Sequence, residues 1–178
     1  DALFAAAQQR GMRIVAGQCL MDRHAPADLT VAVDQSERDS ENLIARWHGQ
    51  DRLAYCVTVR FAPTSTDTQL AMAGRLLARH AGLYMQTHVA ESRAEVAWIA
   101  ELFPEARSYL DVYERAGLLN ERAVLAHGIW LDDADRTLLA ARGSTDAQGV
   151  YSLVGLRAGR YRLAADAGSH IDWWKVDV

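Results

Sequence analysis

Three side chains that could do chemistry stand at the carboxyl ends of three apolar runs. They are Arg60 after residues 53–59, His88 after residues 83–87 and His127 after residues 123–126. An imidazole can bind a metal ion or move a proton, and a guanidinium can hold a planar, acceptor-rich group. If the runs are neighbouring parallel strands, their carboxyl ends lie side by side, where sites form in such folds. One histidine at a strand end is more often a structural residue. Two at matching strand ends leave a shared functional site open beside that interpretation.

Glu91 lies three residues beyond His88, just before a residue that can cap a helix. A carboxylate held there is well placed to shuttle a proton beside a metal site. It could equally be an acidic residue stabilised by the N-terminus of the following helix. The remaining histidines are interpreted as solvated surface residues: His24, His48, His80 and His170.

Strands and helices alternate over residues 1–142, which is the pattern that must position these side chains. Strands are predicted at 12–20, 53–59, 83–87 and 123–126. Helices are predicted at 3–7, 36–47 and 109–115, and from residue 132 to near 143. Two more are predicted to begin at the capping-box sequences 66–69 and 92–95. Such alternation implies βαβ units and a parallel sheet.

About four βα units are too few to close an eight-stranded barrel, which needs about 250 residues. The pattern therefore leaves two architectures open: an open doubly wound sheet, or half of a barrel.

The character of the sequence changes after Gly143. Five of the twelve glycines fall between there and the C-terminus. Residues 151–153 and 161–163 alternate apolar and polar side chains, as in a β-hairpin, and 169–178 could add a third strand. We predict two parts: an α/β part at 1–142 and a short antiparallel β tail at 143–178.

Composition excludes several classes of protein. The 178 residues carry 19 Lys and Arg against 23 Asp and Glu, with a pI near 5.8, so neither nucleic acid nor an anionic membrane is an expected partner. No apolar run approaches the roughly 18 residues of a membrane-spanning helix. The chain begins without Met or a leader sequence and is expected to be a piece of a longer protein. Cys19 and Cys56 are predicted to be buried free thiols, which suits a reducing, cytoplasmic compartment.

Four segments resemble the guanine deaminase family of the amidohydrolase superfamily in order and approximate spacing. They read MDRHAP (21–26), RFAPTS (60–65), THVAES (87–92) and AHG (126–128). The likeness covers roughly residues 1–142 and includes the connecting helices near 96–98, 102–106 and 109–113.

This resemblance implies an incomplete (β/α)8 TIM-type barrel that binds Zn²⁺. His88 and His127 match two zinc ligands of the family, and Glu91 matches the acid/base that protonates a purine ring nitrogen. Arg60 and Phe61 match the pair that holds guanine, with Arg60 expected to be buried. The implied reaction converts guanine and water to xanthine and ammonia in purine catabolism, and the implied assembly is a homodimer.

The sequence also departs from the family. It has no counterpart of the family's early His-x-His pair or late metal-binding Asp, so we expect this chain alone to be inactive. The tail resembles a strand pair of the carboxypeptidase regulatory-like β-sandwich family. The alternatives are another amidohydrolase-superfamily aminohydrolase or chlorohydrolase, and a non-catalytic binding module.

Overall fold

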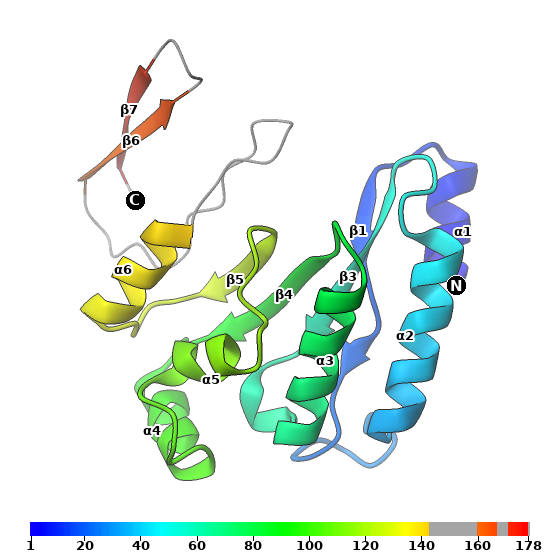
Figure 1. The fold of residues 1–178 in the computed structure, drawn as a ribbon, viewed down its shortest axis with the longest axis horizontal. Coiled ribbons are helices and arrows are strands. Elements are labelled where there is room, and N and C mark those ends of the chain that lie inside the picture. The colour runs from blue at the N-terminus through cyan, green and yellow to red at the C-terminus, as the bar shows by residue number, and fades with distance from the viewer. Residues whose placement is uncertain (143–159, 167–170, 178) are drawn as a thin grey trace.

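A five-stranded parallel sheet forms the centre of the fold (Figure 1). The computed structural model describes residues 1–142, 160–166 and 171–177. The strands are β1 (Ile14–Ala16), β2 (Cys19–Leu20), β3 (Leu53–Val59), β4 (Tyr84–Val89) and β5 (Ala123–His127). Their order is β1-β3-β4-β5, with β2 also paired to β3, and every pairing among them is parallel.

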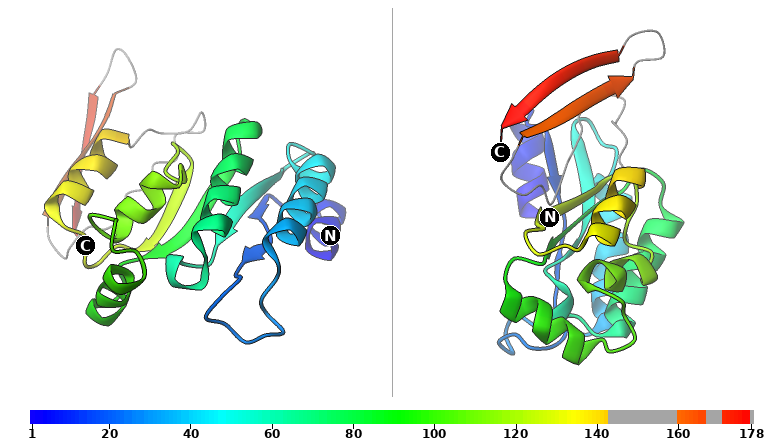
Figure 2. Two further views of the ribbon diagram at one scale, coloured as in Figure 1. Left: turned by 60° about the horizontal axis from the view of Figure 1, so that its bottom comes forward. Right: turned by 90° about the vertical axis from the view of Figure 1, so that its left-hand side faces the viewer.

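Helices alternate with strands along residues 1–142, as the sequence pattern predicts. They are α1 (Ala2–Gln9), α2 (Val33–Trp47), α3 (Asp67–Arg79), α4 (Arg93–Leu102), α5 (Tyr109–Arg115) and α6 (Asp133–Arg142), with a 3-10 turn, η1, at Ala62–Thr64. Helices α2, α3 and α5 lie along one face of the sheet, and two further views show the same arrangement (Figures 1 and 2).

Local sequence explains where α3 and α4 begin. The side chain of Thr66 accepts the backbone N–H of Gln69, and Ser92 accepts that of Glu95, as the capping-box sequences predict. The box at α3 is only half formed, because the side chain of Gln69 accepts a hydrogen bond from Ser65 Oγ instead of returning to Thr66.

Strands β1 and β2 together are the strand predicted at 12–20, interrupted at Gly17. Both pair with β3, and β2 continues the register of β1. A Cβ at Gly17 would lie 1.8 Å from the carbonyl oxygen of Cys56. Only a residue without a side chain lets the two backbones approach so closely.

The two faces of the sheet differ in burial. On the helix-covered face, Tyr55 and Val57 of β3 are buried. On the other face, one row crosses the sheet in register from Cys19 to Val124 through Thr58 and Gln86. The prediction that Cys19 is buried is therefore wrong, because no described element covers this row and its thiol is exposed. Cys56 is buried as predicted, and burial raises the pKa of its thiol to about 12.

The architecture is a parallel half-barrel, which confirms the incomplete TIM-type barrel and rejects the doubly wound alternative. In a closed barrel the side chains of the uncovered row would belong to the packed interior. The antiparallel tail is also present, since β6 (Arg160–Asp166) pairs with β7 (Ile171–Asp177). The predicted strand at 151–153 lies outside the described residues. Among the described helices, none has the length and apolarity needed to span a bilayer.

Candidate functional site

The two histidines predicted at strand ends lie together at the carboxyl edge of the sheet. The ring centroids of His88 and His127 are 5.4 Å apart. In the β4–β5 register His88 faces Ala126 and His127 faces Val89, so a regular pleat would send the two imidazoles to opposite faces.

The backbone at His127 breaks that alternation. His127 has a φ of 71°, in the left-handed region that residues other than glycine seldom adopt. Ala90, after β4, also lies there with a φ of 50°. Unfavourable backbone conformations of this kind gather at functional sites, where surrounding structure holds them.

A backbone carbonyl fixes the orientation of the His88 ring. Nδ1 of His88 lies 2.8 Å from the carbonyl oxygen of Arg60, which also accepts the backbone N–H of His88 at 3.3 Å. A carbonyl only accepts, so Nδ1 carries the proton and Nε2 of the neutral ring keeps its lone pair. This is the arrangement in which a histidine presents Nε2 to a metal ion.

Glu91 lies beside the second histidine. Its Oε2 is 3.5 Å from Nε2 of His127, and its side chain is about half exposed. The carboxylate follows β4 and precedes the N-cap residue Ser92, so the strand–helix junction positions it. The structure thus brings His88, His127 and Glu91 to one edge of the sheet.

Arg60 and Phe61 follow β3 at the same edge. Arg60 is exposed, which corrects the expectation of a buried guanidinium, because no described element covers it. Its Nη1 lies 3.5 Å from Sδ of Met21, and its Cζ is 5.4 Å from the centroid of the Phe61 ring.

An aromatic side chain that was not predicted as a site residue lies beside Phe61. Trp98 of α4 meets Phe61 edge-on, with ring centroids 6.2 Å apart. The ring of His24 lies 5.4 Å from that of Trp98, and its Nδ1 is 2.8 Å from the carbonyl oxygen of Pro63. His24 is exposed, as predicted, but its ring is held in place. Trp98 lies six residues after the N-cap Ser92, in a helix that packs against the turn following β3.

Two imidazoles at this edge, those of His88 and His127, could bind a metal ion. No cluster of three or more His, Cys, Asp or Glu side chains able to hold a metal ion occurs within the described part of the chain. Imidazole nitrogen suits Zn²⁺, and catalytic zinc sites commonly use three protein ligands. The donor chemistry at His88 and His127 fits zinc, but residues 1–142, 160–166 and 171–177 supply fewer ligands than a complete site.

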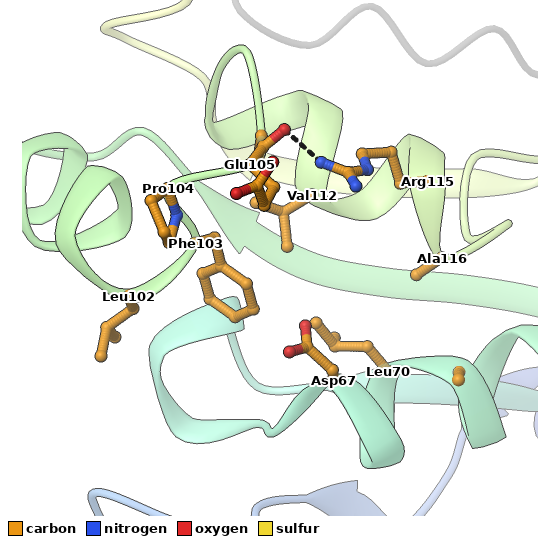
Figure 3. Close-up of a pocket in the computed structure, with 11 residues that line it drawn as sticks. Asp67, Leu70, Leu102, Phe103, Pro104, Glu105, Val112, Arg115 and Ala116 are labelled. Atoms are coloured by element: carbon orange, nitrogen blue, oxygen red, sulfur yellow. Dashed lines mark hydrogen bonds between the residues drawn. The ribbon is translucent and has the colours of Figure 1, made fainter.

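A pocket of about 350 Å³ lies elsewhere, between α3 and the segment that joins α4 to α5 (Figure 3). Phe103, Leu70 and Val112 form apolar walls, and Arg115 donates a hydrogen bond to the carbonyl oxygen of Glu105 across one side. None of the predicted site residues lines this pocket.

Known proteins resemble this chain over most of its length. The amidohydrolase family matches residues 1–162, beyond the predicted division at 142. A guanine deaminase of Escherichia coli is 40% identical over 163 residues, which are 92% of this chain and 37% of the relative. A probable guanine deaminase of Deinococcus radiodurans is 36% identical over 173 residues, which are 96% of this chain and 39% of the relative.

Solved structures agree with the half-barrel. An Escherichia coli guanine deaminase superposes with a TM-score of 0.78 and 42% identity, covering 80% of this chain and 33% of that one. A guanine deaminase from Bradyrhizobium japonicum gives a TM-score of 0.78 and 32% identity, covering 80% and 31%. The chain therefore spans less than two fifths of the length of these relatives.

Proposed function

Because the chain belongs to the amidohydrolase family, we propose that it is part of a zinc-dependent guanine deaminase. The observation that carries the proposal is the pair His88 and His127, with rings 5.4 Å apart and Nε2 of His88 left free by the bond from Nδ1 to Arg60. The named relatives support guanine as the substrate.

In this proposal His88 and His127 hold the zinc ion. When bound, zinc lowers the pKa of a water molecule toward ~7 and so supplies a nucleophile at neutral pH. The carbon of guanine that bears the amino group gains the oxygen of water and loses ammonia, which gives xanthine. Glu91 takes a proton from the water and delivers it to the purine ring nitrogen beside that carbon.

Arg60 and Phe61 bind the purine. The guanidinium of Arg60 donates hydrogen bonds to acceptors on the purine edge, and the ring of Phe61 packs on the base. Trp98 supports Phe61 from α4 through their edge-on contact. No observation favours a different amidohydrolase substrate or a non-catalytic binding module over this proposal.

We propose further that the chain alone does not turn guanine over. Two protein ligands hold zinc less well than three, and the described strands at the two edges of the half-barrel, β1 and β5, have a partner on one side only. The test adds zinc to the 178-residue chain and follows guanine by absorbance, with an intact family member as reference. Turnover close to that of the reference would refute the inactivity.

Four subsidiary proposals accompany this function. Free Cys19 and Cys56 suit the cytoplasm, purine catabolism follows from the substrate, and a homodimer can be tested by the molar mass of the intact protein. The division at residue 142, with a tail of carboxypeptidase regulatory-like type, is supported by the β6–β7 hairpin. If the division is right, residues 1–142 and 1–178 should unfold at similar temperatures.

A further inference from the structure

The hydroxyl of Tyr113 is a buried junction beneath the candidate site. Tyr113 lies in α5, and its side chain is fully buried. Its hydroxyl donates to the carbonyl oxygen of His88 at 2.7 Å and accepts the backbone N–H of Ala62 at 2.8 Å. One oxygen atom therefore joins the residue that follows Phe61 to a proposed zinc ligand.

This hydroxyl uses all of its hydrogen-bonding capacity. A phenol has one proton to donate and two lone pairs to accept with. The second lone pair accepts from Oγ1 of Thr87 at 3.0 Å. Burial raises the pKa of Tyr113, so the hydroxyl keeps its proton and remains a donor at physiological pH.

We propose that Tyr113 is a positioning residue for the site, holding the chain after β3 and the end of β4 in the geometry that orients His88. The inference rests on the proposed function for what His88 binds. The orientation itself depends on the direct link between the two segments, from Nδ1 of His88 to the carbonyl of Arg60. The hydroxyl of Tyr113 supplies a second link between the two segments, through its bonds to Ala62 and His88.

Loss of the Tyr113 hydroxyl should change the geometry around His88, because a water molecule cannot take the place of the hydroxyl in this buried position. Ala62, Thr87 and the Tyr113 ring are all buried. The N–H of Ala62 and the C=O of His88 would both lose a partner in a dry interior, where unpaired groups are costly. Oγ1 of Thr87 already lies 3.4 Å from the carbonyl oxygen of His88, so this carbonyl keeps one donor. We expect the chain around Ala62 to shift toward another acceptor, and that shift to disturb the bond between His88 and Arg60.

The experiment compares Tyr113→Phe with Tyr55→Phe in the 178-residue chain. Tyr55 is the control, because its hydroxyl is also buried and makes two hydrogen bonds where that of Tyr113 makes three, donating to Oγ of Ser40 at 3.0 Å and accepting the N–H of Gln18 at 3.4 Å. Its partners lie away from both histidines. Histidine ¹⁵N NMR reports the tautomer of His88, and zinc titration reports affinity.

We expect His88 to be a single Nδ1–H tautomer in the unmodified chain and in Tyr55→Phe. In Tyr113→Phe we expect a mixture of tautomers and an affinity for zinc lower by about tenfold, as for other residues that orient metal ligands. Equal tautomers and equal zinc affinities in the two variants would overturn the inference.

A measurement on the unmodified chain avoids any failure of Tyr113→Phe to fold. The amide of Ala62 lies outside both strands, yet its hydrogen exchange should be as slow as that of β4 amides, because its acceptor is the buried hydroxyl. Fast exchange at Ala62 would also overturn the inference. If the unmodified chain takes up no zinc, the proposed function fails, while the tautomer and exchange results still decide the role of Tyr113.

Discussion

The Nδ1 atom of His88 lies 2.8 Å from the carbonyl oxygen of Arg60, so the chain after one strand orients an imidazole on the next. The same residue that supplies this carbonyl is the proposed purine-binding arginine. In the proposed function, metal binding and substrate binding are therefore linked through one residue, Arg60. Displacement of the chain after β3 should disturb both.

Replacing Gly74 with Ala should destabilise the chain, although Ala is the better helix former. Within a helix this change normally gains about 1 kcal/mol. A Cβ at Gly74 of α3, however, would lie 1.9 Å from the carbonyl oxygen of Ala116 after α5. We expect a net loss of about 1–3 kcal/mol from overpacking.

Urea denaturation of Gly74→Ala measures this loss, and Ala78→Gly provides the control. Ala78 is exposed on the same helix, so its replacement should cost only about 1 kcal/mol through helix propensity. A Gly74→Ala chain more stable than the unmodified one would show that α3 and α5 do not pack as closely as described.

Asp22 should contribute more to the free energy of unfolding than the exposed residues near it, because it ties the segment after β2 to Thr66 at the start of α3. Its Oδ1 accepts the N–H of Thr66 at 2.8 Å and its Oδ2 accepts the Thr66 hydroxyl at 2.5 Å. Asp22→Asn turns one acceptor into a donor, so we expect a loss of about 1–3 kcal/mol in the free energy of unfolding. Asp28→Asn, an exposed carboxylate in the same segment, should change it little; equal effects would contradict the prediction.

His48 should make the stability of the fold depend on pH. Burial lowers its pKa most, a hydrogen bond to the Ala81 backbone opposes this, and Arg122 lowers it further. Its Nδ1 accepts the N–H of Tyr55 at 3.1 Å and so must stay unprotonated in the fold. The interpretation of His48 as a solvated residue is therefore wrong.

The sign follows from the lowered pKa. As the pH falls below about 6.5, the unfolded chain binds a proton at this residue that the folded chain does not, so stability declines. Above that pH the unprotonated His48 contributes its full share to the free energy of unfolding. Thermal denaturation at pH 5.5 and 7.5 should show a smaller drop for His48→Asn, whose amide oxygen can replace Nδ1; an unchanged drop would exclude His48 as the cause.

The sequence predicted the elements better than the side-chain environments. Capping residues such as Ser92 and the apolar run at 53–59 are local signals, and both elements form as predicted. The burial of Cys19 was predicted wrongly, because it depends on what covers the other face of the sheet and not on the run around it.

The candidate site shows the same limit. Strand ends predicted that His88 and His127 would be neighbours, but not the left-handed φ of His127 that turns the rings toward each other. The sequence did not predict Tyr113 as a site residue. Its hydroxyl contacts backbone atoms of Ala62 and His88, and such contacts do not depend on the residue type at those positions.

Zinc titration of the 178-residue chain tests the central claim most directly. We expect one zinc ion per chain, with the affinity falling at least tenfold in both His88→Ala and His127→Ala. His80→Ala, at the end of α3 beside Glu41, should leave the affinity unchanged. Unaltered zinc binding in His88→Ala or His127→Ala, or none in the unmodified chain, would contradict the claim that these two imidazoles share a metal ion.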